Sequence, residues 1–223
     1  MAAIENYMEK FTLLGPENAE KALEILEKTY KDAKYYLNFD GPLELLVAAI
    51  LSAQTKDVVV NETTPSLFRK YRKTDDFAGA DLPELIKYVR KVSFAENKAK
   101  NIINCCKIIN EKYGGKIPDK MPDLLSLPGI GRKTANTILI NAFGIVEGIP
   151  VDTWVIKLSH RIGLSRSGKP DEIEKDLRKV VAKKYWKNIA YVLKEHGHEV
   201  CKSANPKCGI CPITHICPKN GVQ

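Results

Sequence analysis

The sequence predicts an all-α protein built from amphipathic helices joined by short links. Apolar residues recur at helical spacing through most of the chain; in residues 98–112, for example, Ile102 and Cys106 fall on one apolar face. Residues 43–52 are almost continuously apolar, which is typical of a helix buried on most sides. The sequence offers no convincing pattern of alternating polar and apolar residues, so we expect helices packed on helices.

The same spacing places the individual helices and suggests two lobes. Helices are expected over residues 18–33, 43–52, 83–90, 98–112, 122–127, 133–143, 155–161, 171–184 and 186–196. Gly and Pro interrupt the helical pattern in residues 35–41 and 144–150, which are the candidate boundaries. We therefore expect one lobe over residues 35–147 and a second lobe that combines residues 1–34 with 148–223.

The charge balance favours an anionic partner. The chain carries 35 Lys and Arg against 27 Asp and Glu, a net charge of +8. Nucleic acid fits this surplus better than a membrane does, because each cation that contacts a phosphate releases counterions. The alternative is a basic surface that maintains solubility.

The sequence also bears on the compartment. No segment approaches the roughly 18 apolar residues that span a bilayer, so no membrane association is expected. The first eleven residues, MAAIENYMEKF, lack a basic stretch followed by an apolar run, so no secretion signal is expected. An intracellular, reducing location follows, where cysteines are more often metal ligands or core residues than disulfides.

Four of the six cysteines form the spacing C-x6-C-x2-C-x5-C near the C-terminus. They are Cys201, Cys208, Cys211 and Cys217. Thiolates this close in sequence can converge on one centre, and such soft ligands select zinc or iron–sulfur. Structural zinc sites more usually show two close pairs with a longer spacer, whereas this run has one close pair flanked by single cysteines. The spacing therefore matches a cubane cluster better; a disulfide pair or unrelated core thiols is the alternative.

The other two cysteines, Cys105 and Cys106, are predicted to be core residues. They lie on an apolar helical stripe, and a buried free cysteine commonly behaves as a small hydrophobe.

A Gly-Ile-Gly turn between two predicted helices forms a candidate hairpin for phosphate. A short helix ends at Pro128, and a new helix begins near Arg132. Glycines permit positive φ and close backbone approach, and the amides at the new helix start are donors for a phosphate. Ile130 is expected to anchor the turn in the core. The alternative is an ordinary turn between two helices. The residues expected to contact DNA here are Pro128, Gly129, Ile130, Gly131 and Arg132.

Lys133 and Asp152 are the candidate catalytic residues. Lys133 sits beside Arg132 near the positive end of a helix dipole, and both features disfavour an ammonium and make the neutral amine more accessible. A phosphate-binding surface lysine is the alternative. Asp152 can cap the following helix, and it can also stabilise developing positive charge or assist proton transfer.

These motifs together resemble the endonuclease III family of helix-hairpin-helix DNA glycosylases. The resemblance rests on LPGIGRKTAN, then VDTW, then HGHEVCKSANPKCGICPITHIC, with LSAQTKD and FAENKA upstream. It covers roughly residues 42–217. It implies a six-helix barrel lobe and a second lobe that carries a 4Fe–4S cluster on the four cysteines, with DNA lying across the cleft between the lobes.

The resemblance also implies roles for individual residues. Lys133 is the implied catalytic amine and Asp152 its partner. Gln54 is expected to enter the gap left by an extruded nucleotide, and Phe94 to enter the opposite strand as a wedge. The loop from Cys201 to Cys208 is expected to bind phosphate through Lys202 and Lys207.

The implied activity is a bifunctional glycosylase and AP lyase of base excision repair, acting as a monomer on duplex DNA with a damaged base or an abasic site. Such an enzyme flips the damaged nucleotide out of the stack. Oxidised pyrimidines are the expected lesions. The rival interpretations are a monofunctional mismatch-specific glycosylase, a non-catalytic DNA-binding module with structural zinc, and an iron–sulfur electron carrier. Lys133 favours the lyase, because the monofunctional relatives generally lack a lysine there.

Three residues depart from the family pattern. One is His198, which stands where the family often carries a basic residue. Trp154 stands where the aspartate motif usually continues with His, and Phe94 is bulkier than the aliphatic wedge often found at its position. These departures leave the local chemistry around Asp152 and the opposite-strand preference open.

Overall fold

The computed structural model describes residues 11–222, and within them every regular element is helical. The all-α prediction is therefore confirmed. The chain divides into two compact units. Unit 2 is Tyr36–Glu147, and unit 1 combines Met1–Tyr35 with Gly148–Gln223. The expectation drawn from the first eleven residues falls almost entirely outside the described residues. No helix within residues 11–222 has the length and apolarity needed to cross a membrane.

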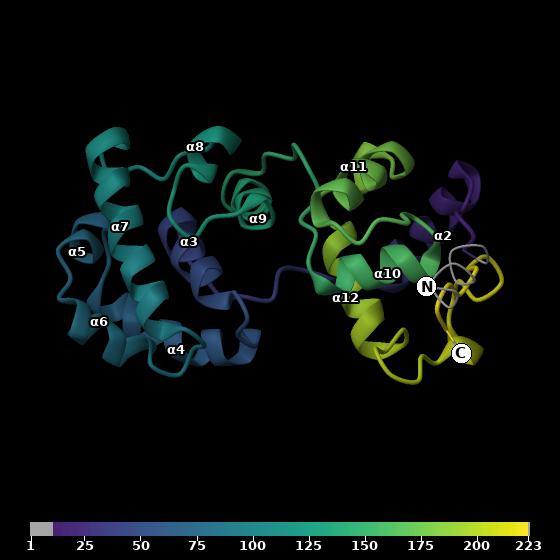
Figure 1. Ribbon diagram of the computed structural model, residues 1–223, viewed down its shortest axis with the longest axis horizontal. Helices are drawn as coiled ribbons and strands as arrows, with labels where there is room; N and C mark the ends of the chain where they lie inside the picture. Colours follow the sequence, from purple (N-terminus) through teal and green to yellow (C-terminus); the bar gives the residue numbers. More distant parts are fainter. Residues whose placement is uncertain (1–10, 223) are drawn as a thin grey trace, which may run out of the picture. The chain divides into compact units, whose positions relative to one another are not determined.

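Unit 2 is organised around a central buried helix (Figure 1). Its elements are α3 (Gly41–Ser52), α4 (Asp57–Lys70), α5 (Thr74–Ala78), α6 (Leu82–Val89), α7 (Ala95–Tyr113), α8 (Met121–Leu125) and α9 (Arg132–Phe143). Seven consecutive residues of α3, 45–51, are buried, and α3 contacts α4, α7 and α9. This all-round burial is the arrangement that the continuous apolar run predicts, and each buried Leu or Ile stabilises the fold by about 1.5–3 kcal/mol.

The helix α4 was not among the predicted helices. Its sequence contains three consecutive valines, two threonines and Pro65, all of which are poor helix formers. Packing decides the outcome, because α4 contacts α3 and α6 and buries Val60 and Leu67. Pro65 lies on the exposed side of the helix. The Asn61 side chain further fixes α4 by donating to the Tyr36 carbonyl over 2.9 Å.

Unit 1 joins the two ends of the chain (Figure 1). Its described elements are α2 (Pro16–Thr29), α10 (Thr153–Ile162), α11 (Pro170–Val180), the 3-10 turn η1 (Lys183–Tyr185), α12 (Ile189–Glu199) and the 3-10 turn η2 (Cys208–Ile210). The helix α2 packs against α11 and α12, and α10 packs against the same two helices. The N-terminal helix therefore completes the core of the C-terminal half.

The end of α11 differs from the prediction of one helix over residues 171–184. The helix ends at Val180, η1 follows, and α12 begins only at Ile189. Trp186 explains the break, because its indole N–H donates to the Val181 carbonyl over 2.8 Å and its ring is largely buried. Arg178 lies over that ring at 5.1 Å from its centre. The indole therefore satisfies a carbonyl that a continued helix would have used.

Candidate functional site

The Gly-Ile-Gly turn forms a tight hairpin between α8 and α9. The Ile130 amide donates to the Leu127 carbonyl over 3.2 Å, and Gly129 adopts a φ of 79°. Ile130 is only 6% exposed, so the turn is anchored in the core as predicted. Gly131 is the N-cap residue of α9, and no side chain caps the helix there. The first amides of α9 therefore lie at an exposed glycine, where an external anion can accept from them.

The hairpin is held against α7 by two close contacts. A Cβ atom added at Gly129 would lie 2.8 Å from the Asn101 amide nitrogen, so only glycine fits there without a shift. The Cys105 thiol donates to the Pro128 carbonyl over 3.1 Å. Burial raises the pKa of Cys105 to about 12, so the thiol keeps its proton and remains a donor. Cys105 and Cys106 are both fully buried, which confirms their assignment to the core.

Lys133 is the second residue of α9, directly after Arg132. Both residues are half-buried, in the first turn that follows the hairpin. The Lys133 carbonyl accepts from the Thr137 hydroxyl over 2.9 Å, which fixes the backbone one turn further on. The candidate amine is thus carried by a well-packed helix start rather than by a loose loop.

Asp152 is the N-cap residue of α10 in unit 1. Its Oδ1 atom accepts from the amides of Trp154 and Val155, each over 2.9 Å, so the predicted capping role is confirmed. The cap fixes one carboxylate oxygen against the backbone. A carboxylate has further acceptor positions, so capping leaves Asp152 able to receive another donor or to face a developing charge.

Trp154, the departure from the family pattern, packs against the start of the cysteine-bearing region. A Cβ atom added at Gly197 would overlap the Trp154 ring, so the indole rests directly on the glycine backbone. His198 meets the ring edge-on at 4.8 Å between centroids, and Lys157 lies 5.0 Å from the ring centre. Trp154 therefore ties the first turn of α10 to α12.

Gln54 and Phe94 lie in two exposed loops of unit 2. Gln54 follows α3 and has a φ of 54°; Phe94 precedes α7 and has a φ of 57°. The Phe94 side chain is a large apolar group at 63% exposure. Neither residue is glycine, so the left-handed backbone at Gln54 and at Phe94 is disfavoured.

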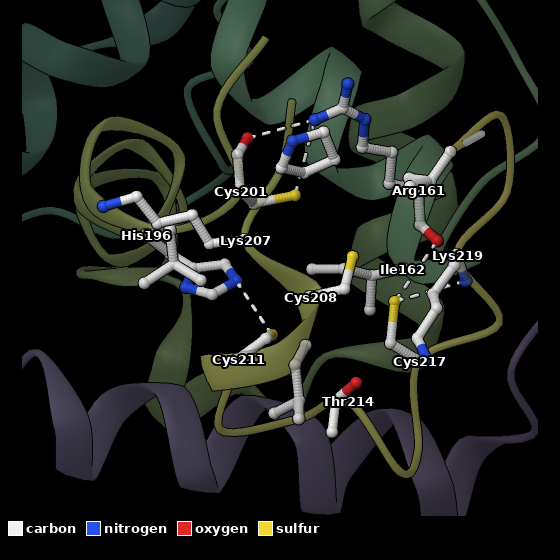
Figure 2. A pocket seen from close by; sticks show the side chains of 14 residues that line it. Arg161, Ile162, His196, Cys201, Lys207, Cys208, Cys211, Thr214, Cys217 and Lys219 are labelled. Carbon is white, nitrogen blue, oxygen red and sulfur yellow. Dashed lines mark hydrogen bonds between the residues drawn. The ribbon is translucent and has the colours of Figure 1, made fainter. Parts of the chain in front are cut away.

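Four cysteine side chains surround one pocket in unit 1, as Figure 2 shows. They are Cys201, Cys208, Cys211 and Cys217. The pocket has an empty volume of about 350 Å³, part of it open to solvent, and Ile162, Val200 and Ile213 contribute apolar walls. The structure thus brings together all four thiols that the spacing singled out. In residues 11–222, no group of three or more His, Cys, Asp or Glu side chains is arranged to hold a metal ion.

Burial changes the pKa of two thiols in this pocket. Burial raises the pKa of Cys217 to about 11, and burial likewise raises the pKa of Cys211. The neighbouring cysteines add to both increases, because several thiolates in one small space repel each other. A cationic centre reverses this repulsion, so loading the pocket with metal should release protons.

Arg161 organises the loop that follows Cys201 (Figure 2). Its guanidinium donates to the carbonyls of Cys201, Lys202 and Ser203 over 3.1, 2.7 and 2.9 Å, and to the Cys201 sulfur over 3.5 Å. The side chain of Lys157 also bonds that of Ser203. These contacts hold residues 201–203, and the Lys207 amide donates to the Val200 carbonyl over 2.9 Å. Lys202 and Lys207 both lie exposed on this loop.

His196 lies beside the same pocket and makes two polar contacts there. Its Nδ1 atom is 3.0 Å from the Tyr30 hydroxyl, and its Nε2 atom is 3.6 Å from the Cys211 sulfur. Burial lowers the pKa of His196 to about 4, so the ring is neutral. Nothing in the sequence around Arg161 or Tyr30 marks either residue as part of this site. Their partners are 40 and 166 residues away, so no local pattern could have identified them.

Comparison with known proteins places this arrangement in a family. Residues 47–183 match the HhH-GPD superfamily of base excision DNA repair proteins. The chain is 43% identical to endonuclease III of Synechocystis sp. over 202 residues, which cover 91% of this chain and 92% of the relative. It is 38% identical to endonuclease III of Bacillus subtilis over 206 residues, or 92% and 94% of the two chains.

A solved structure gives the same result. The chain matches a trapped covalent intermediate of endonuclease III with DNA at a TM-score of 0.88 and 37% identity, covering 93% of this chain and 98% of the other. The chain therefore belongs to the endonuclease III family of HhH-GPD base excision repair proteins.

Proposed function

We propose that this chain removes oxidised pyrimidines from duplex DNA through a Schiff base on Lys133 and then nicks the strand by β-elimination. DNA glycosylase and AP lyase activity follow from its family. The observation that carries the residue-level proposal is the position of Lys133, one residue inside a helix that begins at the exposed glycine of the hairpin. A phosphate bound at the hairpin amides would bring the neighbouring sugar within reach of this amine.

The proposed chemistry uses two side chains. The neutral Lys133 amine attacks C1′ of the extruded nucleotide, and the base leaves with the electron pair of the glycosidic bond. Asp152 stabilises the positive charge that develops on the sugar and assists the proton transfers. The sugar opens to a Schiff base, a proton leaves C2′, and the C3′–O bond breaks with the 3′ phosphate as leaving group. Water then releases the enzyme.

We assign DNA positioning to three sets of residues. The hairpin residues hold the phosphate backbone, with the backbone amides of Gly129, Gly131 and Arg132 as donors, which positions the strand without reading sequence. Gln54 and Phe94 fill the gap beside the extruded nucleotide, and Lys202 and Lys207 contact phosphates from the cysteine loop. The hairpin residues in this assignment are Pro128, Gly129, Ile130, Gly131 and Arg132. The proposed partner is one duplex with a damaged base or abasic site for each copy of the chain.

We further propose that the four cysteines hold a 4Fe–4S cluster. Four soft thiols that line one pocket are the donor set that such a cluster requires. A structural zinc site places every sulfur about 2.3 Å from one ion, whereas a cubane attaches each cysteine to a different iron and needs a larger space. The space of about 350 Å³ that the four thiols line supports the cluster. When bound, the cluster supplies an anchor for the loop that carries Lys202 and Lys207.

Borohydride trapping tests the proposed reaction. The wild-type chain should form a covalent adduct with a duplex containing one thymine glycol and with an abasic duplex, because borohydride reduces the Schiff base. Lys133→Gln should bind both duplexes and form no adduct. Asp152→Asn keeps an acceptor at the helix cap and removes the charge, so it should slow base release while still forming an adduct on the abasic duplex.

Each other outcome points to a different correction. An adduct on the abasic duplex alone would keep the lyase and assign another base lesion. Tight binding without an adduct on either duplex would indicate a monofunctional glycosylase or a binding module. Trapping that survives Lys133→Gln would remove this residue from the mechanism. A colourless protein containing zinc rather than iron and sulfide would overturn the cluster assignment independently.

A further inference from the structure

The two loops that carry Gln54 and Phe94 share an unusual backbone state. Both residues have left-handed φ values, 54° and 57°, although neither is glycine. Such conformations are disfavoured and persist only where surrounding contacts hold them in place. Both side chains are exposed, so they do not provide that hold themselves. The contacts that fix these loops must therefore lie beneath them.

Lys98 lies beneath the first loop. It is a lysine at only 5% exposure, and its ammonium donates to the Leu51 carbonyl, the Ala53 carbonyl and the Thr55 hydroxyl over 2.7, 2.5 and 2.9 Å. A lysine has three donor hydrogens, and these three partners use all of them. The two carbonyls are at the C-terminal end of α3, where the helix dipole favours a cation. Lys98 thus binds the residues on both sides of Gln54.

Thr55 connects this site to the second loop. Its Oγ1 atom accepts from the Ser93 amide over 3.0 Å as well as from Lys98 over 2.9 Å. Ser93 directly precedes Phe94, and the Lys98 amide donates to the Phe94 carbonyl over 3.1 Å to start α7. One hydroxyl therefore joins the residue after Gln54 to the residue before Phe94.

A role in helix capping alone does not account for these contacts. The carbonyls of Leu51 and Ala53 would satisfy a capping lysine, whereas the Thr55 bridge reaches a different loop. Burial lowers the pKa of Lys98 to about 8. The ammonium form therefore still predominates at neutral pH. The fold thus keeps a costly buried charge at the point where the two loops meet.

We propose that Lys98 is a positioning residue that, through Thr55, fixes the Gln54 and Phe94 loops as one rigid unit for insertion into DNA. The inference rests on the proposed function, because insertion by these two side chains is part of it. Loops that are already ordered lose little conformational freedom when they bind. Both side chains then enter the duplex together, and discrimination between damaged and intact DNA depends on the bridge.

Thr55→Val is the most direct test, because it keeps the side-chain shape and removes the shared acceptor. Affinity of the full chain is measured for a duplex with a tetrahydrofuran abasic analogue and for an undamaged duplex. The ratio of the two affinities should fall by about tenfold, as expected for one lost hydrogen bond to a charged group. Binding to undamaged duplex should stay unchanged, since the hairpin remains intact.

Three further variants separate positioning from stability. Thr55→Ser keeps the oxygen and should restore the affinity ratio. Lys98→Met should lower the ratio at least as much as Thr55→Val does. Lys100→Met is the matched control, because Lys100 is an exposed lysine of the same helix that pairs with Glu96 over 2.6 Å. Its affinity ratio should equal that of the wild type. Circular dichroism checks that every variant is folded.

A second readout follows insertion itself. A 2-aminopurine base opposite the abasic analogue should brighten when the wild-type chain unstacks it, and should brighten less with Thr55→Val. If Thr55→Val retains both the affinity ratio and the fluorescence change, the inference is wrong even if Lys98→Met does not fold. A wild-type chain that forms no borohydride adduct on abasic DNA overturns the proposed function instead, so the two failures are distinguishable.

Discussion

The hairpin and the cysteine loop are both proposed to bind phosphate, yet they are held in place by different forces. The hairpin has Leu124 and Ile130 beneath it at 0% and 6% exposure, and it rests on α7. In the loop over residues 201–212, by contrast, no residue is classed as buried. Apolar packing therefore fixes the hairpin, whereas polar contacts, several of them from Arg161, hold the loop.

This difference indicates which part of the site depends on metal. Burial of apolar area stabilises the hairpin whatever the state of the cysteines. The loop has only its polar contacts and the proposed bonds from its cysteines to a cluster, and metal binding of this kind contributes directly to folding. Cluster loss should therefore disorder the loop and leave the hairpin ordered.

Cys211→Ser should have the largest effect, because it removes one of the proposed ligands, from the centre of the cysteine run. We expect iron content to fall to background and amide hydrogen exchange to rise across residues 201–212. Exchange in residues 124–143 should not change. DNA affinity should fall by about tenfold, since the proposed phosphate contacts of the loop would be lost. Iron analysis, hydrogen exchange and binding to an abasic duplex measure the three effects.

Cys106→Ala is the matched control for this prediction. Cys106 is a fully buried cysteine in unit 2, so its loss should lower stability there without changing the iron content. A fully loaded and stable Cys211→Ser protein would contradict the assignment of Cys211 as a ligand. Equal increases in exchange at the hairpin and at the loop would contradict the separation of the two regions.

Gly129→Ala should have an intermediate effect, confined to the hairpin. The alanine would occupy a φ of 79°, which costs about 1–2 kcal/mol, and its Cβ would press on the Asn101 side chain. A melting temperature lower by roughly 2–8 °C follows for a chain of this size, together with weaker DNA binding and an unchanged iron content.

Gly131→Ala provides the matched control in the same turn. Gly131 has a φ of −95°, and a Cβ atom there meets nothing within 4 Å. This variant should therefore melt at the wild-type temperature. If both variants melt alike, the left-handed backbone at Gly129 does not limit the stability of the hairpin.

Local signals made most of the fold and site predictable from sequence. The turn at Gly129 and the cysteine spacing are each contained within a few residues, and the structure forms the hairpin and gathers the thiols into one pocket. Two other features depend on contacts between distant segments. The helix α4 forms against its own propensities because α3 and α6 pack on it. In the sequence, Lys98 looks like any other lysine of a helix. Only the fold places it under the loop that carries Gln54, where its partner Ala53 is 45 residues away.

Lys207→Ala should have the smallest effect on affinity. It tests whether the cysteine loop binds phosphate through charged side chains, whereas the hairpin binds it through uncharged backbone amides. An exposed lysine that contacts a phosphate releases a counterion, so its loss should reduce the slope of log affinity against log salt by about 0.9. Lys202→Ala should do the same. Gly129→Ala should weaken binding and leave the slope unchanged, because the hairpin amides carry no net charge.

Binding to undamaged duplex across a salt series measures these slopes. Lys21→Ala is the control, since Lys21 is an exposed lysine of α2 that pairs with Glu17 over 2.8 Å, and its slope should match the wild type. An unchanged slope in both loop variants would show that neither lysine contacts phosphate. The cysteine loop would then contribute backbone contacts alone, and the two regions would bind DNA by the same means although different forces hold them.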